Sequence, residues 1–399
     1  MADRQQQGGR RQSGRRYWSK PDRAFTLALL VLTGFGLLMV FSASMYTSSV
    51  SSATGSGYTQ FVKQAVYVIG GLFVLWFASR IDYRKFNNVH VAVVALIITA
   101  ALLGLVLAAG SEVNGAKRWL AVGSITFQPS EFAKLTGIIY ASSIVCQKKE
   151  VYSNFWKFTL YCILPMVVLC GLAAIEPSLS AAMAIGFGML CVYFFSGIKF
   201  RYFIPYILLI VAAVGLALIL QPFRLDRIRV FMGKGGADYQ IRQSILAIGS
   251  GGIFGKGLGN GRQKMLFLPE LQNDFIFANI GEECGLVGCV LLLILYGFII
   301  YRGIRIAKAS KTKFGYVYGC SIMALLGFQV IVNVAVATNI MPVTGMALPF
   351  ISAGGTSMII LFFMMSLIVN MSRKPGRKVT VGEPKTKRRK RQKTEEKTA

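Results

Sequence analysis

Asp274 is the acidic residue whose surroundings most favour catalysis, because it stands where a polar segment meets a long apolar run. Glu282 and Glu283 follow inside that run, and carboxylates at membrane depth are costly enough to indicate a function or a charge partner. A carboxylate at such a boundary, beside Phe275 and Phe277, can serve as a general base. The alternative is structural, since short polar side chains often cap the first turn of a helix.

The segment 221–274 is polar and net basic, which suits an anionic ligand because Arg and Lys bind phosphate groups. Arg262 and Lys264 are among its basic residues, and Glu270 is one of its few acids. Alternatively, these charges pair among themselves. The glycine-rich stretch 249–259 lacks the Gly-Lys-Ser/Thr sequence of a nucleotide-binding loop. It predicts tight turns and close backbone approach, which a lipid-diphosphate site could use.

Two further clusters of polar residues interrupt apolar runs. The first comprises Lys117, Arg118 and Trp119, followed by Gln128, Glu131 and Lys134. Pro129 suits the first turn of a helix, and Glu131 and Lys134 are spaced to pair on one helix face. The second is the proline- and glycine-rich stretch 341–357, which includes Ser352 and Gly354. Non-helical backbone at membrane depth must line protein or water, so this stretch predicts a re-entrant or cavity-lining turn.

The elements that position these residues are transmembrane helices. Of the 399 residues, 54% are hydrophobic and only 15% charged, which excludes ordinary water-soluble classes. A spanning helix needs about 20 apolar residues. We therefore predict an all-α polytopic membrane protein of about ten helices, at 24–46, 60–79, 89–109, 130–146, 158–175, 179–196, 203–220, 275–301, 315–337 and 353–371. The large loop 221–274 then connects helices 7 and 8.

The distribution of basic residues predicts the orientation. The formal net charge is +28, and the basic residues gather in the arm 1–23, the tail 372–399 and alternate loops. This is the positive-inside pattern of a membrane protein rather than a nucleic-acid surface. We expect cytoplasmic termini, a transmembrane domain at 24–371, an outward-facing loop 221–274, and adhesion of the basic ends to anionic lipid.

Histidine and cysteine usage removes several kinds of catalysis. His90 is the single histidine, so Ser-His-Asp and Cys-His catalysis and multi-histidine metal sites are excluded. The seven cysteines lie in or beside apolar runs without CxxC spacing, which argues against disulfides and structural zinc.

The sequence resembles the SEDS family (shape, elongation, division and sporulation) of bacterial cell-wall proteins over about residues 24–371. The motifs that carry the resemblance are NGAKRW (114–119), QPSEFAKL (128–135), GKGLGNGRQKMLFLPELQNDFIFANIGEE (255–283) and PVTGMALPFISAGGTS (342–357). The loop motifs are more similar to the FtsW and SpoVE branch than to the RodA branch. Where relatives commonly have Pro-Asp-Leu-Gly, this chain has Pro177-Ser178-Leu179-Ser180, so no acidic role is carried to that loop.

The resemblance implies a glycosyltransferase that polymerises lipid II outside the membrane and releases undecaprenyl diphosphate, with Asp274 at the position of the essential carboxylate. It implies a class B penicillin-binding transpeptidase and other divisome proteins as partners, at the septal inner membrane. The predicted substrate-binding residues are Lys117, Arg118, Trp119, Gln128, Glu131, Lys134, Arg262, Lys264, Glu270, Ser352 and Gly354. A divalent cation (Mg or Mn) is a possible cofactor, with Glu283 or Glu270 as ligand.

Three alternatives remain open at this point. A lipid II flippase would have the same intramembrane acids and broken helices without covalent chemistry. A RodA- or SpoVE-type polymerase would serve elongation or sporulation. A division scaffold would depend on the basic tails and not on Asp274.

Overall fold

The computed structural model describes residues 21–51, 58–113, 116–122, 125–176, 178–206, 208, 239–265, 267–268 and 271–373. The helices are α1 (Arg23–Ser51), α2 (Thr59–Ala78), α3 (Val89–Ala109), α4 (Pro129–Gln147), α5 (Phe155–Phe158), α6 (Leu164–Ile175), α7 (Leu179–Ser196), α10 (Tyr239–Gly251), α11 (Ile276–Lys308), α12 (Lys313–Ala337) and α13 (Thr356–Ser372). A π-helical turn, Thr159–Ile163, joins α5 to α6.

The prediction of an all-α polytopic membrane fold is confirmed for the spanning part of the chain. In the described residues, 7 helical segments are long and apolar enough to cross a membrane. The polar α4 and the 17-residue α13 match two more predicted runs. The remaining predicted run, 203–220, lies mostly outside the described residues. Glu176-Pro177 does separate two helices, because α6 ends at Ile175 and α7 begins at Leu179.

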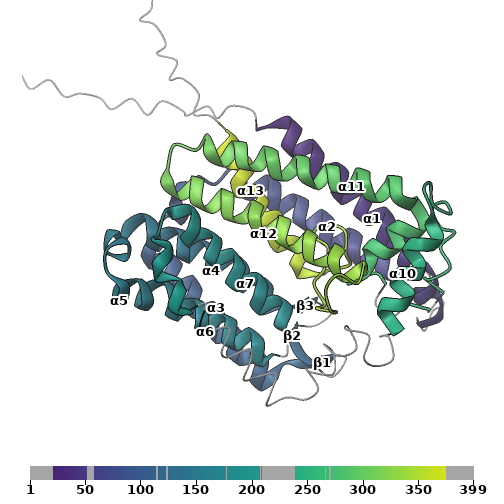
Figure 1. Cartoon of the computed structure of the whole chain (residues 1–399), viewed down its shortest axis with the longest axis horizontal. Coiled ribbons are helices and arrows are strands. Elements are labelled where there is room, and N and C mark those ends of the chain that lie inside the picture. Colours follow the sequence, from purple (N-terminus) through teal and green to yellow (C-terminus); the bar gives the residue numbers. More distant parts are fainter. Residues whose placement is uncertain are drawn as a thin grey trace, which may run out of the picture. The chain divides into compact units, whose positions relative to one another are not determined.

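Helices α4 and α12 form the core of the bundle. Helix α4 packs against α3, α7 and α12, while α12 also packs against α11 (Figure 1). This explains why α4 can be less apolar than the other helices of the bundle core: its Ser142 and Ser143 are buried by protein. Apolar side chains on the outer helices, such as Val94 and Ile97 on α3, are exposed, as expected of surfaces that face lipid.

A small antiparallel sheet lies between α3 and α4, where the sequence predicted only a polar loop. It consists of β1 (Ser111–Val113), β2 (Ala116–Val122) and β3 (Ile125–Phe127), in the order β1-β2-β3. The pairs Leu120 with Phe127 and Val122 with Ile125 set the register of the second hairpin. The connecting residues are Asn-Gly and Gly-Ser, which are typical of hairpin turns, and this signal should have revealed the strands.

The basic residues gather at one end of the bundle, opposite the sheet. The ends of α2, α4, α7 and α11 meet there, and the adjacent basic residues are Arg80, Arg84, Lys85, Lys148, Lys149, Lys199, Arg201, Arg302, Arg305, Lys308, Lys311 and Lys313. The sheet, α10 and the first turns of α4, α7 and α13 lie at the other end (Figure 1). The positive-inside rule predicts that this second end faces outward.

Candidate active site

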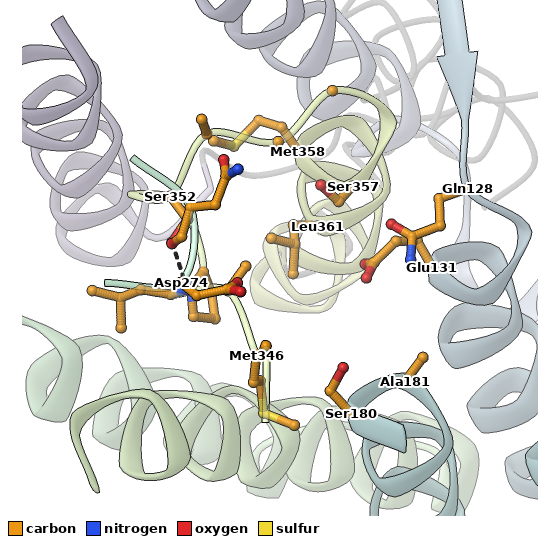
Figure 2. Close-up of a pocket in the computed structure, with 18 of the residues that line it drawn as sticks. Gln128, Glu131, Ser180, Ala181, Asp274, Met346, Ser352, Ser357, Met358 and Leu361 are labelled. Carbon is orange, nitrogen blue, oxygen red and sulfur yellow. Dashed lines mark hydrogen bonds between the residues drawn. The ribbon is translucent and has the colours of Figure 1, made fainter. Parts of the chain in front are cut away.

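A cavity of about 660 Å³ opens at the end of the bundle that carries the sheet. Its walls come from segments far apart in the sequence: the first turns of α2, α4 and α7, strand β2, the turn before α11, and the non-helical stretch before α13 (Figure 2). The residues predicted for the site that line it are Asp274, Arg118, Trp119, Gln128, Glu131, Lys134, Ser352 and Gly354.

Asp274 is positioned by a turn that two later segments hold in place. The Ser352 hydroxyl donates to the Asn273 carbonyl at 2.6 Å, and the Ala353 N–H donates to the Gln272 carbonyl at 2.8 Å. The Asn333 side-chain amide donates to the carbonyl of Asp274 at 2.9 Å. These bonds fix the backbone on both sides of Asp274; Figure 2 shows Ser352 beside Asp274.

The capping alternative for Asp274 is wrong. Helix α11 begins at Ile276, and its N-cap residue is Phe275 and not Asp274. The side chain of Asp274 faces the cavity instead, next to Gly345, where an added Cβ would come within 3.4 Å of a carboxylate oxygen. Figure 2 shows Asp274 and Glu131 on facing walls.

Glu131 and Lys134 form the ion pair that their spacing predicted. The Lys134 Nζ and a Glu131 carboxylate oxygen are 2.7 Å apart, and both side chains are largely buried in the cavity wall. Pro129 is in the first turn of α4, as expected. Because the pair is internally compensated, the charge that Lys134 presents to the cavity is smaller than that of an unpaired ammonium.

One wall of the cavity was missed by the sequence analysis. Gln60, Lys63, Gln64 and Tyr67 on α2 all line it. Gln64 also holds the stretch before α13 in place, because its side-chain amide oxygen accepts a hydrogen bond from the Gly354 N–H at 3.1 Å. The spacing i, i+3, i+4, i+7 is a polar stripe on one face of an otherwise apolar helix. That pattern was visible in the sequence and could have identified this wall.

Lys264 and Glu283, predicted as a diphosphate ligand and a metal ligand, lie outside the cavity and pair with each other. The Lys264 Nζ is 3.1 Å from a Glu283 carboxylate oxygen, and both side chains are buried. The Ser42 hydroxyl lies 2.7 Å from each Glu283 oxygen, and the Gly259 N–H donates at 3.1 Å. Both charges therefore have partners within the protein, and the partner of Lys264 is an acid of α11 and not another residue of the loop 221–274.

Arg262 also does not line the cavity. The side chain of Arg262 is exposed, and its backbone N–H donates to Glu282 at 2.9 Å. Lys117 is in β2, but its side chain is not among the described ones, and Glu270 lies outside the described residues.

The glycine-rich stretch makes its close backbone approach to α11. Helix α11 is broken at Gly285, whose φ is 67°. The backbone N–H groups of α11 just after the break donate to the glycine-rich stretch; the Leu286 N–H, for example, donates to the Gly252 carbonyl at 2.9 Å. An added Cβ on Gly255 would lie 2.2 Å from the Glu283 carbonyl oxygen. A broken helix needs partners for its freed backbone groups, and the loop supplies them.

The residues around Glu283 do not fit a divalent cation. Its two oxygens already accept from a hydroxyl and an ammonium, and the ammonium of Lys264 would repel a metal ion. Within the described part of the chain, no group of 3 or more His, Cys, Asp or Glu side chains is placed to hold a metal. We therefore derive no step through a metal ion at Glu283.

Comparison with known proteins shows the family of the chain. A family profile for FtsW, RodA and SpoVE, described as cell cycle protein, matches residues 22–376. The probable peptidoglycan glycosyltransferase FtsW of Coxiella burnetii is 34% identical over 366 residues, covering 89% of this chain and 96% of the relative. Stage V sporulation protein E of Bacillus subtilis is 30% identical, covering 89% of this chain and 98% of the relative.

Solved structures share the fold. A peptidoglycan synthase complex, described for its structural coordination of polymerization and crosslinking, contains a chain that superposes with a TM-score of 0.72 at 25% identity, covering 89% of this chain and 98% of that one. The crystal structure of the rod shape determining protein RodA of Thermus thermophilus gives a TM-score of 0.65 at 27% identity, covering 88% and 96%.

Proposed function

We propose, from the premise that this chain belongs to the FtsW, RodA and SpoVE family of cell cycle proteins, that it is a peptidoglycan glycosyltransferase that polymerises lipid II. Its relatives in Geobacter metallireducens and Coxiella burnetii are named probable peptidoglycan glycosyltransferases. The observation that carries the assignment of the site is Asp274, fixed at the wall of a cavity that Lys63, Arg118 and Lys134 also line.

The reaction joins two lipid II molecules. A sugar hydroxyl of one attacks the anomeric carbon of the other, undecaprenyl diphosphate leaves, and the configuration at the anomeric carbon inverts. Asp274 accepts the proton of the attacking hydroxyl as general base. A diphosphate is already a good leaving group, so its departure needs positive charge rather than the second, acidic carboxyl of a glycoside hydrolase.

The positive charge comes from basic residues on different walls of the cavity. Arg118 offers a planar guanidinium that suits bidentate contact with phosphate oxygens, and Lys63 offers an exposed ammonium on α2. Lys134, already paired with Glu131, contributes less net charge and fixes the carboxylate of Glu131 opposite Asp274. We assign the diphosphate to Arg118 and Lys63.

The same comparisons support a partner and a place of action. A structural neighbour belongs to a complex that coordinates polymerization with crosslinking, which supports a class B penicillin-binding transpeptidase as the partner that crosslinks the strands. Several relatives are named FtsW, which supports a role in division at the septal membrane.

Polymerisation by the purified full chain tests the function. The chain, with and without a class B penicillin-binding partner whose transpeptidase is blocked, is incubated in detergent with labelled lipid II, and glycan length is read on a gel. We expect polymer from the wild type and a loss of about 10²–10⁴-fold for Asp274→Asn, the range for a lost general base.

Asp82→Asn is the matched control, because it makes the same change at the opposite end of the bundle. It should leave the polymer yield unchanged. Undiminished polymer from Asp274→Asn would refute the assigned base. A wild-type chain that leaves lipid II monomeric in both conditions, yet exchanges it between the leaflets of vesicles, would be a flippase instead.

A further inference from the structure

Glu176 is a buried carboxyl group behind the wall of the cavity. It follows Ile175, the last residue of the apolar span 155–175, in the turn that leads to α7. Its side chain is 0% exposed, and neither carboxylate oxygen has a hydrogen-bond partner among the described residues. A buried carboxylate without hydrogen bonds is unfavourable as an anion, so the neutral acid is favoured.

Arg118 connects Glu176 to the cavity. Its Nε donates to the Glu176 carbonyl at 3.4 Å, at the C-terminal end of α6, where a positive charge is favoured by the helix dipole. Arg118 itself lines the cavity, and so do Ser178 and Ser180, which follow Glu176 along the chain. The same guanidinium therefore serves two sites: the buried turn and the cavity.

The protonation of Glu176 is balanced near neutral pH. Burial raises the pKa of Glu176 to about 7, and the positive charge of Arg118 opposes that rise. The other titratable groups on the elements packed around α6 are Cys170 on α6 itself, His90 on α3, Glu131, Lys134, Tyr140 and Cys146 on α4, Cys191 and Tyr193 on α7, and Tyr161 and Cys162 on the π-helical turn. Among the described charged groups, Arg118 is the one that acts on the Glu176 carboxyl.

We propose that Glu176 is a positioning residue for the lipid diphosphate and acts through Arg118. As a carboxylate, Glu176 attracts the guanidinium towards the α6–α7 turn; as a neutral acid, it leaves the guanidinium to the diphosphate in the cavity. Engagement of Arg118 by the diphosphate is accompanied by uptake of at most one proton from water, which neutralises Glu176. This inference rests on the proposed function, because it takes lipid II as the ligand.

The direction of the pH effect follows from linkage. In the free protein Arg118 lowers the pKa of Glu176, and a diphosphate that neutralises Arg118 removes this lowering, so the pKa rises on binding. Affinity is therefore greatest below the pKa of the free protein and falls as pH rises through about 7. If one proton is taken up, the affinity can fall at most tenfold for each pH unit. We expect it to fall about three- to tenfold between pH 7 and 8.

The test is the binding of purified lipid II to the full-length protein in detergent, measured between pH 6 and 9. Lipid II is a diphosphate diester, so its own phosphates do not titrate in this range. We expect the wild-type Kd to rise above pH 7, whereas Glu176→Gln, neutral at every pH, should keep the low-pH affinity throughout. Glu150→Gln, the same change on an exposed residue at the opposite end, should behave as the wild type.

Three outcomes decide the inference. Equal pH slopes in the wild type and Glu176→Gln would overturn it and leave the proposed function intact. If the Kd of Glu176→Gln still rose with pH, and this rise disappeared only with Arg118→Gln, the titrating group would be one other than Glu176. That result would also overturn the inference. Absence of lipid II binding at every pH would overturn the inference together with the proposed function. The melting temperature of each variant is recorded, and if Glu176→Gln does not fold, Glu176→Asn replaces it with the same expectation.

Discussion

The buried pair of Lys264 and Glu283 makes a prediction that separates a structural role from a binding role. If Lys264 has a structural role, Lys264→Met leaves the Glu283 carboxylate, which is 0% exposed, without a positive charge beside it. Its remaining hydrogen-bond donors are then the Ser42 hydroxyl and the Gly259 N–H. Breaking one partner of a buried ion pair costs about 3–5 kcal/mol. With roughly 2 °C for each kcal/mol in a large domain, the apparent Tm in detergent should fall by about 6–10 °C.

The assay is thermal unfolding of the purified chain, followed by lipid II turnover on the protein that remains folded. Replacing both partners, as Lys264→Met with Glu283→Gln, should cost less than the sum of the two single changes, because no uncompensated charge remains. Lys157→Met is the matched control. Its ion pair with Glu150 is exposed on both sides, at 45% and 60%, so we expect no measurable change in Tm.

A different result would restore the binding role that the sequence suggested. If Lys264→Met kept the wild-type Tm and raised the KM for lipid II about tenfold or more, the ammonium would be contacting the substrate and not Glu283. The contacts of Glu283 with Ser42 and Gly259 tie the loop to α1 and α11. We therefore expect the stability change and an unchanged KM.

Two further predictions concern the loop and the missed wall of the cavity. Gly255→Ala should lower the yield of folded protein, because the φ of +80° costs an L-residue about 1–2 kcal/mol and the added Cβ would meet the Glu283 carbonyl oxygen at 2.2 Å. Gly249→Ala is the control, because its added Cβ meets nothing within 4 Å, and it should be neutral or stabilising. Both variants are measured by membrane expression and thermal unfolding. Lys63→Gln should raise the KM for lipid II about 10- to 100-fold, the loss of one charged contact, with an unchanged Tm; equal KM values for Lys63→Gln and the wild type would remove α2 from the binding site.

The spanning helices and the stretch before α13 could be predicted because bilayer thickness imposes a length on apolar runs. The same physics explains why Met346, Ser352 and their neighbours line a cavity, since non-helical backbone at that depth needs water or protein. The sheet is hard to predict for a local reason: its strands are short, and apolar residues such as Ile125 stand among polar and turn residues. Nothing in hydropathy distinguishes such strands, whereas the turn residues between them do.

The site itself is harder to predict, because the two partners of an ion pair are close in the folded structure but can be far apart in the sequence. Lys264 and Arg118 are both basic residues in polar segments between helices, yet Lys264 is next to Glu283 and Arg118 lines the cavity. The residues that flank Lys264 and Arg118 in the sequence do not indicate this difference. Glu131 and Lys134 could be paired in advance only because a helix fixes the distance between residues three apart. Across a loop, the identity of the partner depends on the fold.

Asp274, Glu282 and Glu283 are three carboxylates of one segment, yet their environments differ. The difference distinguishes paired acids from an acid that faces the cavity. Glu282 accepts from Lys256 at 2.8 Å and Glu283 accepts from Lys264 at 3.1 Å, so both neutralise ammonium groups of the loop that repairs the broken helix α11. Asp274 has its backbone fixed by Ser352 and Asn333, and its side chain faces the cavity. A costly acid at membrane depth indicates either pairing or function. Here the two glutamates are paired with the loop that contacts the broken helix, while the side chain of Asp274, a few residues earlier, faces the cavity.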